Sequence, residues 1–124
     1  MRIDDFTQER IKSEIYGIVM DNASKEALKA YKNLDFDVDI DFVDKHFVFS
    51  GFKHNEPVDE IKKRGGIVHG SMVKKADYLV IDMYSPGVVK LDKALELRKQ
   101  GYPVCIISSH QLYEAFKHTE PIDA

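Results

Sequence analysis

The sequence predicts an α/β domain built on a parallel sheet with helices on both faces. Short segments rich in β-branched and aromatic residues recur from residue 46 onward, and such segments are typical of buried strands. Longer amphipathic segments lie between most of them, with the spacing of helices. Strands that alternate with helices favour parallel pairing and helical cover on both faces of the sheet.

Two short helices are expected ahead of the sheet. In the first, Ile11, Ile15, Ile18 and Val19 follow the spacing of one helical face. Ser24 is a suitable N-cap for the second. Helices this short are marginally stable alone. We therefore expect them to pack on each other, on the following domain or on a second copy of the chain.

Residues 35–42 alternate aspartate with apolar side chains. Period-two alternation puts the carboxylates on one face of an extended segment. We expect a linker or an edge strand, whose charges discourage pairing with another sheet. A calcium site is the alternative, but an EF-hand loop that starts at Asp35 or Asp37 requires glycine where Ile40 or Phe42 stands.

The rest of the chain is expected to follow the order β-α-β-β-α-β-α. The strands are predicted at residues 46–50, 67–69, 78–81 and 103–107. Asn55 can cap the helix after the first strand, and Gly65 with Gly66 can end it. The next helix is expected to precede Gly101. A last helix should begin with a capping box, for which Ser108 and Gln111 have the spacing.

The charge, the cysteine content and the length of the apolar runs exclude some classes of function. The net charge of −3 argues against a strongly basic nucleic-acid-binding protein, but the charge is uneven. Residues 1–43 carry six Lys/Arg and ten Asp/Glu, whereas residues 45–118 carry twelve and eight. A basic segment that follows an acidic N-terminal segment can bind phosphate locally. The lone Cys105, expected to be buried and inert, fits a reducing cytoplasm, and no apolar run approaches the ~20 residues that span a membrane.

Four blocks of sequence, in order and with natural spacing, resemble the BRCT domain: FVFSG, RGGIV, GSMVKKADYLVI and VKLDKALEL. The resemblance is to the subtype of bacterial NAD-dependent DNA ligases and of the replication factor C large subunit. It implies a four-stranded parallel sheet in the order 2-1-3-4, flanked by three helices. The chain then divides into a helical extension with an acidic linker (residues 1–43), a BRCT domain (44–118) and a tail (119–124).

The resemblance implies phosphate binding rather than catalysis. The family's pocket uses a Ser or Thr followed by Gly at the end of the first strand, with a lysine at the start of a later helix. The matching residues are Ser50, Gly51 and Lys90, and Lys93 one turn later is a further or alternative contact. A hydroxyl and a backbone N–H can donate to phosphate oxygens, and lysine adds a point charge. In the plainer interpretation, Ser50 and Gly51 form a turn and the lysines are solvated.

Four further residues are candidates for contacts with a DNA backbone. Lys53 and His54 lie where the replication-factor subtype has a basic residue that helps to hold DNA, and Lys74 and Lys75 lie on an expected loop. Exposed loop lysines without a ligand are the plainer interpretation of the second pair. The histidines show no metal-ligand spacing, so we expect neither a metal nor another cofactor.

The implied function is a non-enzymatic module of a DNA replication or repair protein, which binds DNA at a 5′-phosphate end or nick. The alternative is a protein-interaction module, either a phosphopeptide reader or a dimerisation domain that uses the N-terminal helices. A third class is a scaffolding module without a ligand. Tandem BRCT domains that read phosphopeptides usually carry tryptophan in the last helix. This chain has no tryptophan, which favours the ligase and replication-factor subtype.

Overall fold

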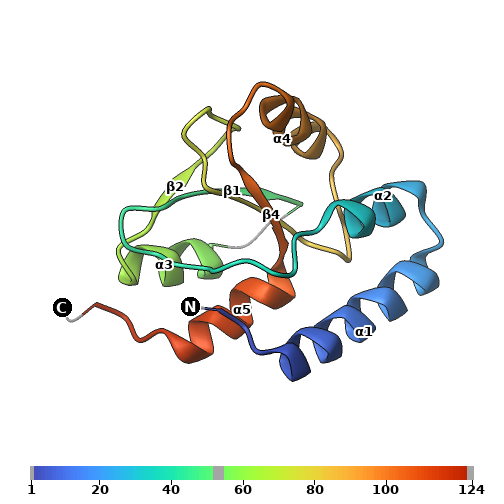
Figure 1. Ribbon diagram of the computed structural model, residues 1–124, viewed down its shortest axis with the longest axis horizontal. Coiled ribbons are helices and arrows are strands. Elements are labelled where there is room, and N and C mark those ends of the chain that lie inside the picture. Colours follow the sequence, from blue (N-terminus) through green and yellow to red (C-terminus); the bar gives the residue numbers. More distant parts are fainter. Residues whose placement is uncertain (1, 52–54, 123–124) are drawn as a thin grey trace.

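The computed structural model describes residues 2–51 and 55–122, and within them the chain forms five helices and four strands (Figure 1). In chain order they are α1 (Asp5–Asn22), α2 (Lys25–Asn33), β1 (His46–Ser50), α3 (Glu56–Lys63), β2 (Ile67–His69), β3 (Tyr78–Ile81), α4 (Val89–Lys99), β4 (Cys105–Ser108) and α5 (Ser109–His118). The predicted order of elements is confirmed.

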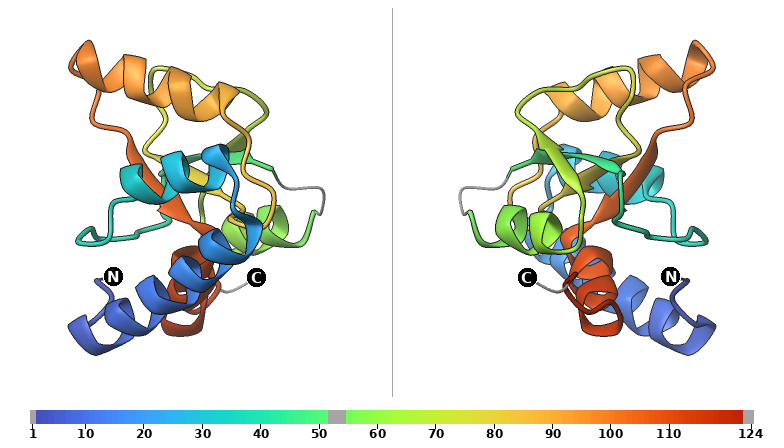
Figure 2. Two further views of the ribbon diagram at one scale, coloured as in Figure 1. Left: turned by 90° about the vertical axis from the view of Figure 1, so that its right-hand side faces the viewer. Right: turned by 90° about the vertical axis from the view of Figure 1, so that its left-hand side faces the viewer.

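The four strands form one parallel sheet in the order β2-β1-β3-β4, as the resemblance implies. Helix α4 covers one face of this sheet, and α3 and α5 cover the other (Figure 2). All four residues of the central strand β3 are buried, because a strand covered on both faces meets no solvent. The expected α/β architecture is therefore confirmed.

The core is formed by side chains from the sheet and from the helices on both of its faces. Leu79 of β3 and Ile106 of β4 are fully buried, and so are Ile61 of α3, Leu91 of α4 and Leu112 of α5. Burying one such side chain stabilises the fold by about 1.5–3 kcal/mol. This packed core holds the carboxyl ends of the strands, where the candidate site lies, in fixed positions.

Helix ends confirm most of the predicted signals. Ser108 and Gln111 form the capping box of α5, with the Gln111 Oε1 atom 2.8 Å from the Ser108 backbone N. Gly65, with φ of 85°, follows α3. The predicted cap by Asn55 is wrong, since its side chain makes no capping hydrogen bond. Its backbone is already in the right-handed helical region (φ −87°, ψ −12°), whereas side-chain caps use an extended backbone.

The two N-terminal helices pack on the domain, as expected. Ile11 and Ile15 of α1 are buried in the same hydrophobic core as the strands. At the junction with α5, the guanidinium of Arg10 lies 3.3 Å from the carboxylate of Glu114. Ser24 caps α2 by accepting a hydrogen bond from the backbone N–H of Ala27. No helix in the described part of the chain is long and apolar enough to cross a membrane.

The acidic segment between α2 and β1 begins beside the open edge of β4. The backbone N–H of Asp35 donates to the Ile106 carbonyl at 2.7 Å, and the Ile106 N–H donates to the Asp35 side chain at 2.8 Å. Because a side chain rather than a backbone carbonyl accepts the second bond, the segment does not continue along β4 as a strand. Of the two expected alternatives, a linker and an edge strand, the segment is therefore the linker, in which Ile40 and Phe42 are buried and Asp37 is exposed as the alternation indicates.

Candidate phosphate site

The candidate site lies at the carboxyl ends of the two central strands. From β1 the chain proceeds to β2 on one side of the sheet and later to β3 and β4 on the other. Ligands of open α/β sheets bind at such a switch point, outside the carboxyl ends of the strands. Ser50 ends β1 at this point, and its register partner Ile81 ends β3.

Gly51 makes the tight exit from β1. Its φ is +88°, and a Cβ atom added there would lie 2.2 Å from the carbonyl oxygen of Ser85. A side chain is therefore excluded both by the backbone conformation and by the loop that follows β3. This close approach places the Gly51 backbone directly against residues 82–87.

Lys90 reaches the end of β1 from the first turn of α4. Its ammonium donates to the carbonyl oxygen of Phe49, the residue before Ser50, at 2.7 Å. The Ser50 side chain is buried, and its hydroxyl donates to the Gly87 carbonyl at 3.3 Å. Ser50, Gly51 and Lys90 therefore meet at one place, and the hydroxyl and the ammonium both already have protein partners there.

Two further features set the electrostatics of the site. The first turn of α4 has no side-chain cap, since Val88 at its N-cap position makes no such hydrogen bond. Uncapped N–H groups and the helix dipole favour an anion. Asp82, directly after β3, acts in the opposite direction. Its half-buried carboxylate accepts a hydrogen bond from the Tyr84 N–H at 3.0 Å and carries negative charge beside Gly51.

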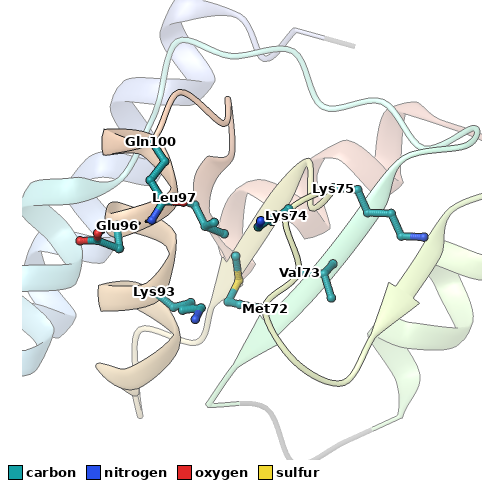
Figure 3. A pocket seen from close by; sticks show the side chains of 8 residues that line it. All are labelled: Met72, Val73, Lys74, Lys75, Lys93, Glu96, Leu97 and Gln100. Atoms are coloured by element: carbon teal, nitrogen blue, oxygen red, sulfur yellow. Dashed lines mark hydrogen bonds between the residues drawn. The ribbon is translucent and has the colours of Figure 1, made fainter.

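The other predicted residues that the structure describes lie along α4 and the loop beside it, and Lys93 shares a hollow of about 620 Å³ with Lys90. Lys93, exposed on α4, and the loop residues Lys74 and Lys75 line a groove of about 710 Å³ on the flank of α4 (Figure 3). The Lys74 ammonium lies 5.8 Å from the centroid of the Tyr102 ring. Lys53 and His54 lie outside the described residues.

Sequence reasoning missed two arrangements of histidine. His46 of β1 and His69 of β2 stack, with the Nδ1 atom of His46 2.7 Å from the Nε2 atom of His69. Burial is the main cause that lowers the pKa of His69, and the charges of His46 and Lys75 add to it. His110 carries a buried Nδ1 atom without a hydrogen-bond partner among the described residues, and burial lowers its pKa. His46 and His69 are 23 residues apart in the sequence, so no local spacing in the sequence could have predicted that they form a pair.

Among the described residues, no group of three or more His, Cys, Asp or Glu side chains could hold a metal ion. Cys105 is a free, half-buried thiol in β4, and burial is the main cause that raises its pKa. Thiolate is the nucleophilic form of cysteine. The position and the pKa of Cys105 therefore both disfavour a nucleophilic role.

No protein-family model matches the chain, and no curated protein matches it. Among solved structures, the chain is similar to the crystal structure of S. pombe Rad4 BRCT3,4, with 17% sequence identity and a TM-score of 0.50. The similarity covers 67% of this chain and 45% of the Rad4 chain. This chain therefore matches less than half of the length of the Rad4 chain. At this identity the similarity shows the fold alone, and the fold of this chain is that of a BRCT domain.

Proposed function

We propose that this chain is a non-catalytic module of a DNA replication or repair protein, and that it binds duplex DNA at a 5′-phosphate end or nick. The observation that carries the proposal is the meeting of Ser50, Gly51 and Lys90 at the switch point of the sheet, next to the uncapped start of α4. A terminal phosphate carries more charge than a phosphodiester, and this site combines a lysine with a helix N-terminus.

Binding requires a local exchange of partners. The Lys90 ammonium would leave the Phe49 carbonyl, and the Ser50 hydroxyl would turn from Gly87 toward a phosphate oxygen. Both exchanges replace a neutral acceptor with an anionic one. For the Ser50 hydroxyl, a neutral hydrogen bond becomes a charge-assisted one, which is about twice as strong, and for Lys90 the ammonium gains an acceptor of opposite charge. Lys93, Lys74 and Lys75 would lie farther along the same flank of the protein, where exposed lysines can attract the remaining phosphates.

The test is a titration of two duplexes that differ in their 5′-phosphate alone, each at two salt concentrations. Lys90→Ala should weaken binding of the phosphorylated duplex about ten- to hundredfold, since a charge-assisted contact contributes about 1.5–3 kcal/mol. It should leave binding of the unphosphorylated duplex unchanged. Asp82→Asn should strengthen binding, because it removes the charge that opposes the phosphate. Lys99→Ala is the matched control from the last turn of the same helix.

Equal affinity of the wild type for the two duplexes would eliminate recognition of the end phosphate. The second candidate is binding of a phosphorylated protein segment at the same residues. It is favoured by the groove that begins at Lys90 and runs along α4, which could hold the residues next to the phosphate. Binding of a phosphopeptide, together with no binding of either duplex, would select this candidate.

A further inference from the structure

A continuous groove runs along α4 beside residues 70–75. It consists of two hollows of about 710 and 620 Å³, which share Met72, Lys93 and Glu96. We call it the α4 groove. Its lining residues are Ser71, Met72, Val73, Lys74, Lys75, Val89, Lys90, Asp92, Lys93, Glu96, Leu97 and Gln100. The hollows have the size of ordinary ligand sites, and their walls come from a helix and from the connection between two strands.

The floor of the α4 groove is apolar. Figure 3 shows Met72 and Leu97 between the loop and the helix, and Val73 also lines the groove. At the end that lies near the start of α4, Val89 is 80% exposed although its side chain is apolar. Apolar side chains that gather in a concave surface mark an interaction site more often than isolated exposed ones do.

The rim of the groove is positively charged. Besides Lys90, whose ammonium is bound to the Phe49 carbonyl, three lysines line it, against the carboxylates of Asp92 and Glu96. Asp92 is already paired with Lys29 of α2. No residue in the described part of the chain forms an ion pair with Lys74 or Lys93, whereas Arg10, Arg64 and Arg98 each have a carboxylate partner. The rim therefore offers unneutralised ammonium groups on both sides of an apolar floor.

We propose that the α4 groove binds an acidic, apolar peptide segment of a partner protein. Apolar side chains of the segment would contact Met72 and Val89, and its carboxylates would meet Lys74 and Lys93. Charge complementarity of this kind guides association and fixes register. The proposal goes beyond phosphate binding and requires no phosphate on the peptide.

Single-stranded nucleic acid fits the groove less well. Proteins that bind it without sequence preference stack bases on aromatic rings, and none of the residues that line the α4 groove is aromatic. A peptide with both apolar and acidic side chains matches the apolar floor and the lysines of the rim.

The experiment uses the full chain labelled with nitrogen-15 and a synthetic peptide in which aspartate alternates with leucine. Amide shifts on addition of the peptide should concentrate in residues 71–75 and 89–97. A peptide in which lysine replaces aspartate should shift none of them, and one in which serine replaces leucine should bind about fivefold more weakly or worse. Oligothymidylate of similar length is the competing probe.

The same peptide-binding experiment is repeated with two groove variants and two matched control variants. Lys74→Glu and Val89→Ser should each weaken peptide binding about fivefold. Lys62→Glu on α3 and Val43→Ser, whose residue is 58% exposed outside the groove, should leave it unchanged. All four positions are exposed, so the variants should fold.

The proposal is overturned if the aspartate-leucine peptide shifts no groove amide, or if the groove variants and their controls bind it equally well. It is also overturned if oligothymidylate shifts the same amides at lower concentration than the peptide does. The groove variants leave Lys90 unchanged and the peptides carry no phosphate, so the groove and the phosphate site can fail separately.

Discussion

Asp35→Ala should destabilise the fold more than the same change at Asp37, the neighbouring aspartate of the alternation. The Asp35 side chain accepts a hydrogen bond from the Ile106 backbone N–H at 2.8 Å and pairs with the guanidinium of Arg98. Ile106 is fully buried, so its N–H would have no partner after the substitution. A lost hydrogen bond to a charged acceptor costs about 1.5–3 kcal/mol, which we expect as the decrease in the free energy of unfolding.

Urea unfolding followed by circular dichroism measures this decrease. With a denaturant slope of about 1–3 kcal/mol per molar, the midpoint should fall by roughly 1 M for Asp35→Ala. Asp35→Asn keeps an acceptor but loses the charge, so its effect should be smaller. Asp37→Ala is the matched control, since Asp37 pairs with Arg2 where both side chains are more than half exposed (71% and 58%), and such pairs contribute about 0–1 kcal/mol. Equal midpoints for Asp35→Ala and Asp37→Ala would refute the reasoning.

Two further predictions concern backbone and thiol chemistry. Gly51→Ala should lower the free energy of unfolding by about 1–3 kcal/mol or more, because its Cβ atom would meet the Ser85 carbonyl at 2.2 Å at a φ of +88°. Gly17→Ala, in the middle of α1 with nothing within 4 Å, should instead stabilise by about 0.5–1 kcal/mol, and thermal unfolding distinguishes the two. Cys105 should react with a thiol reagent more slowly than free cysteine at neutral pH, because burial raises the pKa of its thiol; fast reaction of the folded protein would contradict this.

The parts of the fold that the sequence predicts are those that depend on local patterns. The YLVI run at residues 78–81 is apolar throughout, as a strand covered on both faces must be, and it is one of the two central strands. Ser108 and Gln111 form a capping box, which is encoded within four residues. Gly51 and Gly65 both have positive φ values, where residues with a Cβ atom are strained.

The parts that the sequence does not predict depend on contacts between distant segments. Asp35 belongs to a regular alternation with Asp37, and only the path of the chain beside β4 gives the two carboxylates different roles. The α4 groove exists because residues 71–75 lie beside a helix that begins at Val89. The partners of Ser50 and Lys90 could not be predicted either, because the resemblance aligns residues without describing the loop that covers them.

The pair formed by His46 and His69 should make stability depend on pH. The pKa of His69 in the folded protein lies below its ordinary value of 6.5, mainly through burial and then through the charges of His46 and Lys75. Between the two pKa values the unfolded chain binds more protons than the folded one, so stability is complete above the unfolded pKa of about 6.5 and falls as the pH decreases below it. His110, whose pKa is also lowered by burial, acts in the same direction.

His46→Gln isolates the contribution of the pair. Glutamine can still hydrogen-bond to the His69 ring but never carries a charge, so the loss of stability between pH 7 and about 5 should be smaller than in the wild type. Part of the loss should remain, because His110 is unchanged. His118→Gln, at the exposed end of α5, is the comparison for loss of a histidine outside the pair. The measurement is urea unfolding at a series of pH values, together with an NMR titration of the His69 ring. If His46→Gln and the wild type lost stability in parallel, the charge on His46 would have no part in the pH dependence.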